Sequence, residues 1–142
     1  MWVLLCIPHP ERVGLPRRSA RDNQDVRFTC EEVAREMAEG TLAQEACKAN
    51  VAVANTGLAG PPPIGDKIPA GTQCFAWSYR WRSQTYTFSE TKVFSGDRNT
   101  IRHAAALYAL SRVAHYFDAA VAASARHTNP RNNAKAVIWR TT

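Results

Sequence analysis

The 142-residue sequence lacks any long apolar segment. The apolar run at its start, residues 1–7, is short, has no basic residue before it and ends at Pro8. A membrane-spanning helix needs about 20 apolar residues, and a secretory signal needs a positively charged lead. These patterns argue against both kinds of segment, so we expect a cytoplasmic protein with no membrane partner.

Closely spaced cysteines are also lacking. The four cysteines are Cys6, Cys30, Cys47 and Cys74, and no two of them have the short spacing that is typical of a zinc site. Dispersed cysteines favour reduced thiols in the cytosol over a disulfide framework. The four histidines are scattered and have no partner motif nearby. We therefore expect no metal site and no cofactor.

Acidic residues are absent after Asp118, although four basic residues follow it and the formal net charge is +6. Net charge bears on association and solubility rather than on fold. Residues 77–82 also interleave aromatic and basic side chains, a pattern found on single-strand nucleic-acid surfaces and equally at the closed edge of a core. We rank a nucleic-acid partner last, because basic residues in a tail do not imply a folded binding surface.

The length fits one domain with one core. Residues 1–28 form an atypical, poorly specified lead in which prolines and glycines interrupt an arginine-rich run. Residues 29–118 have the patterns of an ordered α/β domain, and residues 119–142 are expected to be a basic, mobile tail.

The ordered part is predicted to contain two helices and three strands. A capping box at residues 29–32 predicts a helix from Glu31 to about Glu45. Residues 51–54 read as a strand buried on both faces, and residues 71–78 and 85–94 as two further strands. Asp97 is the expected N-cap of the second helix. The expected buried stripe of that helix comprises Leu107, Leu110, Val113, Ala114 and Phe117.

Two features could bind a ligand. The glycine- and proline-rich stretch at residues 55–65 follows an apolar strand, where ligands bind in α/β sheets, and Thr56 offers a hydroxyl. Arg98, with Arg102 one turn later, lies at a helix N-terminus, which favours anions. Lys67 can reach the same region. The alternatives are a tight structural loop, an ordinary helix cap with solvated arginines and a surface lysine.

Four segments occur in an order that resembles one known family. Residues 31–40 look like the helix S-x-E-V-A-x-x-M-A-x-G, and residues 51–61 like the strand and loop A-x-A-V-T-G-I-A-G-P. Residues 67–72 look like K-P-V-G-T, and residues 94–102 like F-x-G-D-R-x-x-I-R. Together they span roughly residues 29–117. The sequence thus resembles the CinA C-terminal domain family, whose free-standing members are PncC-type nicotinamide-nucleotide amidases.

The resemblance implies a three-layer α/β/α domain with a mixed sheet, incomplete at the N-terminus. It implies hydrolysis of nicotinamide mononucleotide to nicotinic acid mononucleotide and ammonia, without a cofactor. Matching motif positions assign Thr56 as the catalytic hydroxyl. The substrate-binding residues that follow from the same match are Gly57, Ala59, Gly60, Lys67, Arg98 and Arg102.

The sequence departs from the family pattern at one point. The family's serine nucleophile lies in an A-E-S-C-T-G-G motif that this sequence lacks, and Ser19 has none of the flanking residues. Acyl transfer needs an activated nucleophile, so we expect an impaired amidase or a non-catalytic nucleotide-binding protein. One hypothesis treats residues 1–28 as a frame-shifted remnant of family sequence, which the coding DNA would test. Without the family's N-terminal strand and helix, an unpaired sheet edge and exposed apolar surface are expected to favour homo-oligomers.

Overall fold

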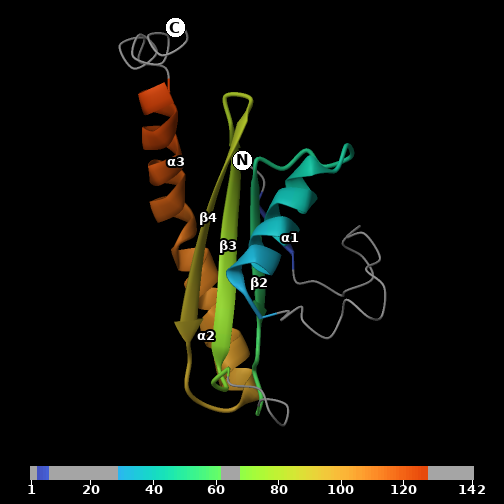
Figure 1. Ribbon diagram of the computed structural model, residues 1–142, viewed down its shortest axis with the longest axis vertical. Helices are drawn as coiled ribbons and strands as arrows, with labels where there is room; N and C mark the ends of the chain where they lie inside the picture. Colours follow the sequence, from blue (N-terminus) through green and yellow to red (C-terminus); the bar gives the residue numbers. More distant parts are fainter. Residues whose placement is uncertain (1–2, 7–28, 62–67, 128–142) are drawn as a thin grey trace, which may run out of the picture.

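The computed structural model describes residues 3–6, 29–61 and 68–127. The elements, in chain order, are β1 Val3–Cys6, α1 Glu31–Ala43, β2 Val51–Gly57, β3 Thr72–Trp81, β4 Gln84–Val93, α2 Arg98–Ser111 and α3 Val113–His127 (Figure 1). The three strands and the first helix that the sequence predicts are all present, with ends that differ by a few residues.

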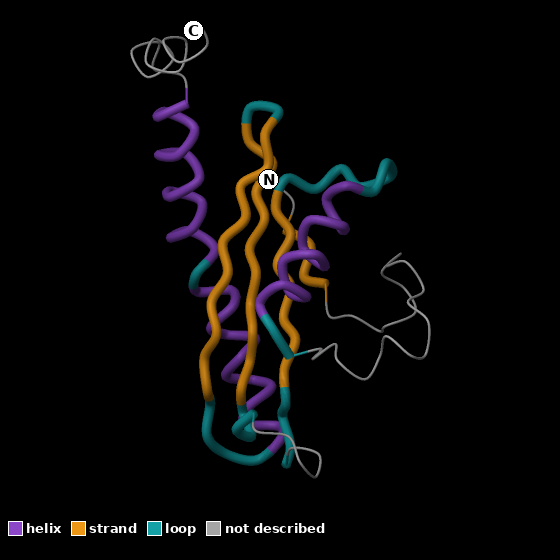
Figure 2. Tube along the Cα trace, in the orientation of Figure 1, coloured by secondary structure: helices purple, strands orange, loops and turns teal. Residues whose placement is uncertain are grey.

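The strands form one mixed sheet in the order β1-β2-β3-β4. β1 runs parallel to β2, whereas β2, β3 and β4 pair antiparallel in succession. Helix α1 covers one face, and α2 and α3 cover the other (Figure 2). The α/β class, the three layers and the mixed sheet are therefore confirmed. β1 lies within the segment that the sequence analysis treats as a poorly specified lead.

The two faces of the sheet carry side chains of different size, because successive residues of a strand point to opposite faces. On the α1 face, β2 and β3 contribute small residues such as Ala52, Ala54 and Ala76, which let the helix approach closely. On the opposite face β3 contributes Phe75 and Trp77, both fully buried under α2 and α3. The large aromatic core therefore lies between the sheet and these two helices.

The start of α1 differs from the prediction. Its N-cap is Cys30, whose side chain makes no capping hydrogen bond, so the predicted capping box is wrong. The carboxylate of Glu31 instead accepts hydrogen bonds from the hydroxyls of Ser89 and Thr91 in β4, each at 2.7 Å. A tertiary contact with the neighbouring strand thus replaces the local cap.

The buried stripe of α2 is also not the predicted one. The buried residues are Ile101, Ala105 and Ala109, whereas Leu107 is 70% exposed and Leu110 is 49% exposed. The aromatic side chains of β3 fill the space beneath α2, so small residues must face them. The prediction that these two leucines are buried is therefore wrong, because it rested on the spacing of large apolar residues alone.

The second helix divides at Arg112, and α3 continues to His127. Val113 and Phe117 pack against the aromatic core as expected, but Ala114 is exposed. Because α3 includes residues 119–127, the helix ends later than the predicted boundary at residue 118. Residues 128–142 lie outside the described residues.

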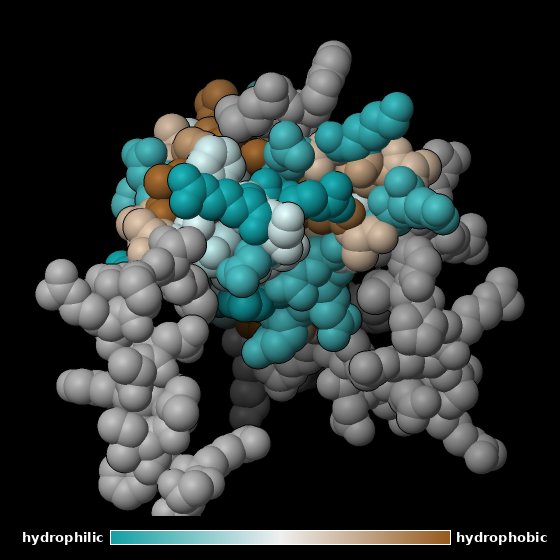
Figure 3. Space-filling model, turned by 90° about the horizontal axis from the view of Figure 1, so that it is seen from above, coloured by the Kyte–Doolittle hydropathy of each residue, from teal (hydrophilic) through white to brown (hydrophobic). Residues whose placement is uncertain are grey.

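The two ends of the sheet differ in character. The β3–β4 hairpin turns at Arg82 and Ser83, both with positive φ, at one end. Seen from that end, hydrophilic side chains gather over the middle and hydrophobic ones show in separate patches (Figure 3). The loops that follow β2 and β4 lie at the opposite end, together with the start of α2 (Figure 2). That opposite end contains those residues assigned to the site that lie within the described ranges.

Candidate functional site

Three segments that are distant in sequence are hydrogen-bonded to one another at the loop end of the sheet. The N–H of Leu58, after β2, donates to the carbonyl oxygen of Thr72 at 2.9 Å. The N–H of Gly71 donates back to Leu58 at 2.8 Å, and the N–H of Phe94 donates to Gly71 at 3.0 Å. The loop after β2, the turn before β3 and the turn after β4 therefore form one framework.

Two glycines allow these segments to approach so closely. Gly71 has φ +84, and a Cβ there would lie 1.9 Å from the carbonyl oxygen of Phe94. A Cβ on Gly57 would lie 2.4 Å from the carbonyl oxygen of Thr72. Neither contact is sterically allowed, so both positions require glycine in this arrangement. The conformation of the loop is thus fixed by backbone packing on its neighbours.

The framework brings Gly60 and Arg98 together. A Cβ on Gly60 would lie 3.9 Å from Nη1 of Arg98, so the guanidinium lies against this part of the loop. The Asp97 carboxylate accepts a hydrogen bond from the N–H of Thr100 at 2.7 Å, which confirms the predicted N-cap and lowers the pKa of Asp97. Arg98 and Arg102 are both exposed on the first turns of α2. This side of the loop can therefore bind an anion.

Thr56 lies on the other side of the strand end. It pairs with Cys74 of β3, and strand alternation places it with Ala52 and Ala54 on the α1 face. Cys74 lines an open pocket of about 500 Å³ at the N-terminus of α1. The remaining lining residues are Thr29, Cys30, Glu31, Glu32, Ile68, Pro69, Thr72 and Thr91. Thr56 is thus the cross-strand neighbour of a residue in the wall of this pocket.

Cys74 is the thiol nearest in register to Thr56, so its protonation state matters for any nucleophilic role. Burial raises the pKa of the Cys74 thiol; a hydrogen bond with Thr91 opposes this, while the nearby Glu31 carboxylate raises the pKa further. The reactive form of a cysteine is the thiolate. Cys74 is therefore a neutral, buried thiol and is a poor substitute for an activated nucleophile.

A pair of amide side chains lies on the opposite face of the same strand end. Nδ2 of Asn55 donates to Oε1 of Gln73 at 3.1 Å and to the carbonyl oxygen of Cys74 at 3.3 Å. Gln73 is only 4% exposed, and a Cβ on Gly57 would lie 2.6 Å from its Nε2. This pair was not predicted from the sequence. The one available signal is that Asn55 occupies the position of a valine in the A-V-T-G family pattern.

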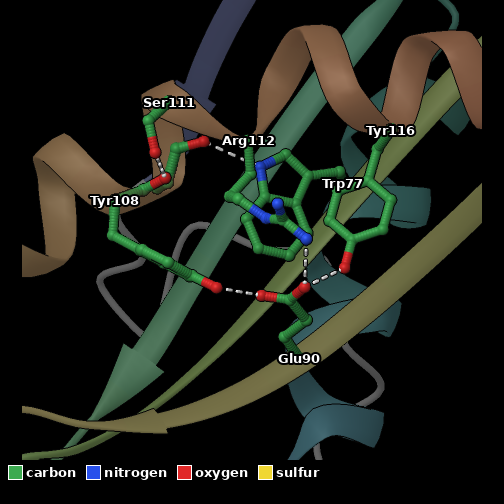
Figure 4. A network of polar contacts seen from close by, with 7 residues as sticks. Trp77, Glu90, Tyr108, Ser111, Arg112 and Tyr116 are labelled. Atoms are coloured by element: carbon green, nitrogen blue, oxygen red, sulfur yellow. Dashed lines mark hydrogen bonds and ion pairs between the residues drawn. The ribbon is translucent and has the colours of Figure 1, made fainter.

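A second polar cluster fixes α2 and α3 against β4 (Figure 4). The Glu90 carboxylate accepts hydrogen bonds from the hydroxyls of Tyr108 and Tyr116, and Arg112 pairs with it at 2.9 Å. Burial by itself raises the pKa of Glu90, but these three donors together lower it below its usual range. Burial, together with the Glu90 contact, raises the pKa of Tyr116 to about 12. The charged carboxylate therefore joins β4 to both helices at the point where they divide.

Of the remaining predicted site residues, the structure describes some and not others. Gly57 is exposed, and Ala59 and Gly60 are half-buried in the loop. Lys67 lies outside the described residues, so its expected approach to the loop stays a prediction. The loop residues and Arg98 come together, whereas Thr56 faces the α1 side of the sheet.

The first aromatic residues of the segment 77–82 lie in the core. Trp77 is 0% exposed and Tyr79 is 1% exposed, and both pack beneath α2 and α3. Arg80 donates to the carbonyl oxygens of Leu42 and Cys47 next to α1. The interpretation as a closed core edge is therefore confirmed for Trp77 and Tyr79, whose buried rings cannot stack on bases.

Two kinds of feature are absent from the described ranges. Within residues 3–6, 29–61 and 68–127, no group of three or more histidine, cysteine, aspartate or glutamate side chains is arranged to hold a metal ion. No helix in the same ranges is long and apolar enough to cross a membrane.

Comparisons with known proteins agree on one family. Residues 19–117 match the family model for the CinA C-terminal domain. Over 91 residues the chain is 43% identical to a putative competence-damage inducible protein of Symbiobacterium thermophilum, a match that covers 61% of this chain and 21% of that protein. Over 80 residues it is 41% identical to the nicotinamide-nucleotide amidohydrolase PncC of Escherichia coli K12, a match that covers 56% of this chain and 46% of that protein.

Solved structures show the same relationship. The crystal structure of the competence damage-inducible protein A from Klebsiella pneumoniae superimposes with a TM-score of 0.53 at 36% sequence identity. The alignment covers 65% of this chain and 53% of that chain. The chain therefore spans about half the length, or less, of the relatives that it matches.

Proposed function

The chain belongs to the CinA C-terminal domain family, and from this premise we propose that it binds a pyridine nucleotide between the loop at residues 56–60 and the start of α2. The observation that carries this proposal is the position of the Arg98 guanidinium, whose Nη1 lies 3.9 Å from where a Cβ of Gly60 would be, beside a loop whose shape two glycines fix. A relative at 41% identity is named a nicotinamide-nucleotide amidohydrolase, which supports this class of substrate.

The phosphate end of the nucleotide is assigned to α2. Arg98 offers a planar, bidentate donor beside Gly60, and Arg102 adds a second charge one turn later. The helix N-terminus adds partial positive charge at the same place. These groups suit a phosphate much better than the pocket at the start of α1, where Glu31 and Glu32 repel anions.

The amide end of the nucleotide is assigned to the strand end at Thr56. In the proposed hydrolysis the oxygen of water ends on the carbonyl carbon, the C–N bond breaks, and the nitrogen leaves as ammonia. The Thr56 hydroxyl and the loop N–H groups would donate to the carbonyl oxygen as negative charge develops there. Lys67 remains a proposed contact to the substrate, and no cofactor takes part.

We propose further that hydrolysis by this chain is slow. The 142 residues contain no A-E-S-C-T-G-G motif, and the Cys74 thiol is held neutral. Loss of an activated nucleophile commonly removes several orders of magnitude from the rate while binding survives. The second candidate function is accordingly nucleotide binding without cleavage, which the intact loop and the position of Arg98 favour.

Ammonia release from nicotinamide mononucleotide by the folded protein separates the two candidates. A slow release that Thr56→Ala abolishes would support the amidase and place Thr56 in its chemistry. No release, together with measurable nucleotide binding, would support the binding function. If the folded protein neither releases ammonia nor binds the nucleotide, the proposed function is wrong.

Self-association remains part of the proposal. Leu107 and Leu110 are large apolar side chains exposed on α2, and β4 has one neighbouring strand among the described residues. Exposed apolar side chains and strand edges both favour contact with a second copy. Sedimentation equilibrium is expected to show dimers, and a monomer at all concentrations tested would contradict this expectation.

A further inference from the structure

The amide pair at the end of β2 has an arrangement that sheet packing alone does not require. Asn55 and Gln73 lie on the face that otherwise carries Val53 and Trp77, in the layer beneath α2. Gln73 is buried there and Asn55 is half-buried, and amide groups withdrawn from water are costly unless they form hydrogen bonds. An apolar residue, such as the valine of the family pattern at position 55, would fill the same place without that cost. The polar pair therefore points to a role beyond stability.

The hydrogen bond from Asn55 fixes which end of the Gln73 amide faces the loop. Nδ2 of Asn55 donates to Oε1 of Gln73, so Oε1 is turned toward Asn55. Nε2 then lies over the position that a side chain of residue 57 would occupy. An amide NH₂ group donates two hydrogen bonds and accepts none. The Nε2 donor of Gln73 therefore faces Gly57, the residue that follows Thr56.

Thr56 and Gln73 flank Gly57 from the two faces of the sheet, since Thr56 lies on the α1 side and Gln73 on the α2 side. Arg98 lies farther along the loop, at Gly60. A ligand whose phosphate binds Arg98 and whose ring enters toward the strand end would bring its carboxamide to Gly57. The position of Gln73 suits a carbonyl oxygen at that end of the ligand.

We propose that Gln73 is a specificity-determining residue that donates through Nε2 to the carboxamide oxygen of the pyridine ring, and that Asn55 is the positioning residue that holds it in this orientation. The proposal rests on the proposed function, because it concerns the same site. It goes further in assigning the recognition of the amide end to the Asn55–Gln73 side-chain pair, which the family motif does not contain.

Binding of two ligands tests the assignment. Nicotinamide mononucleotide carries both the phosphate and the carboxamide, whereas ribose 5-phosphate carries only the phosphate. Gln73→Met keeps an unbranched side chain of similar length but removes the donor. A neutral hydrogen bond contributes about 0.5–1.5 kcal/mol, so the variant is expected to bind the nucleotide about twofold to twelvefold more weakly. Its affinity for ribose 5-phosphate is expected to stay unchanged.

Two further variants complete the test. Asn55→Val leaves the donor in place but releases its orientation, so we expect a smaller loss in the same direction. Gln44→Met changes an exposed glutamine at the far end of α1 and is expected to change neither affinity. Circular dichroism and urea unfolding show whether each variant folds. If Gln73→Met does not fold, Asn55→Val alone provides the comparison of the two ligands.

The outcomes separate this inference from the proposed function. Wild-type protein that binds neither ligand contradicts the proposed function itself. If the wild type binds both ligands, the folded variants decide the role of Gln73. Variants that keep full affinity for both ligands, or lose affinity for both equally, contradict that role and leave the nucleotide site in place. Selective loss for the nucleotide supports the inference.

Discussion

Replacement of Gly57 by alanine tests whether the site loop is fixed by backbone packing. An added Cβ would lie 2.4 Å from the carbonyl oxygen of Thr72 and 2.5 Å from Cδ of Gln73, whereas a Cβ essentially never lies within 3.0 Å of such an atom. The oxygen would have to move by at least about 0.6 Å, the difference between 3.0 and 2.4 Å. That same oxygen accepts the hydrogen bond from Leu58 at 2.9 Å, so the movement strains the framework.

The expected loss follows from this crowding. Overpacking of a close contact costs about 1–3 kcal/mol, and we expect Gly57→Ala to lower the free energy of unfolding by that amount. Urea unfolding followed by tryptophan fluorescence measures it, since Trp77 is buried in the core. Nucleotide binding should weaken as well, because the loop must shift where Gln73 and Thr56 flank it.

Gly40→Ala is the matched control. Gly40 lies within α1, and a Cβ there would have no neighbour within 4 Å. Alanine replaces glycine in a helix with a gain of about 0.5–1 kcal/mol, so this variant should be more stable than the wild type. If Gly57→Ala unfolds at the same urea concentration as the wild type or at a higher one, the close approach of the loop to β3 is wrong.

Three further predictions concern the core and its charges. Because the pKa of Glu90 is lower in the folded protein, its contribution to stability is present above the unfolded pKa and is lost as the pH falls through the folded pKa. Glu90→Gln should therefore flatten the decline in the free energy of unfolding at acid pH, measured by urea unfolding. An unchanged decline would contradict the role of the Glu90 cluster. Leu107→Glu, at an exposed position, should change the free energy of unfolding by no more than about 0.5 kcal/mol and should reduce self-association. Ala109→Leu, at a buried position, should lower the free energy of unfolding by about 1–3 kcal/mol. Equal effects of the two variants on unfolding would contradict the observed buried face of α2. Cys74 should react with iodoacetamide at neutral pH much more slowly in the folded protein than after unfolding, and equal rates would show that the thiol is accessible.

Local patterns in the sequence predicted the elements well. The apolar run that begins at Val51 and the β-rich segments after it are strands, because burial on both faces and alternation are visible in the sequence itself. The cap at Asp97 was also predictable, since its hydrogen bond to Thr100 spans three residues. The four family segments placed the loop and the start of α2 together, and the short distance between the Gly60 position and the Arg98 guanidinium agrees with that placement.

Features that depend on pairing between distant residues were not predictable in this way. The face of α2 is chosen by Trp77, whose ring requires a small residue such as Ala109 above it, and no spacing rule favours alanine over Leu110. The partner of Glu31 lies in β4, and the partner of Asn55 lies in β3. Such contacts appear only when the strand register is known. The sequence therefore predicted a local capping box and a stripe of large apolar residues, whereas the structure has these long-range contacts.

The central claim is that the loop at residues 56–60 and Arg98 form an anion-binding nucleotide site. Calorimetric titration of nicotinamide mononucleotide into the wild type and into Arg98→Ala tests it most directly. A hydrogen bond to a charged group contributes about 1.5–3 kcal/mol, so the variant should bind at least about tenfold more weakly while it stays folded. Equal affinity of the two folded proteins, or no binding by the wild type, would contradict the claim.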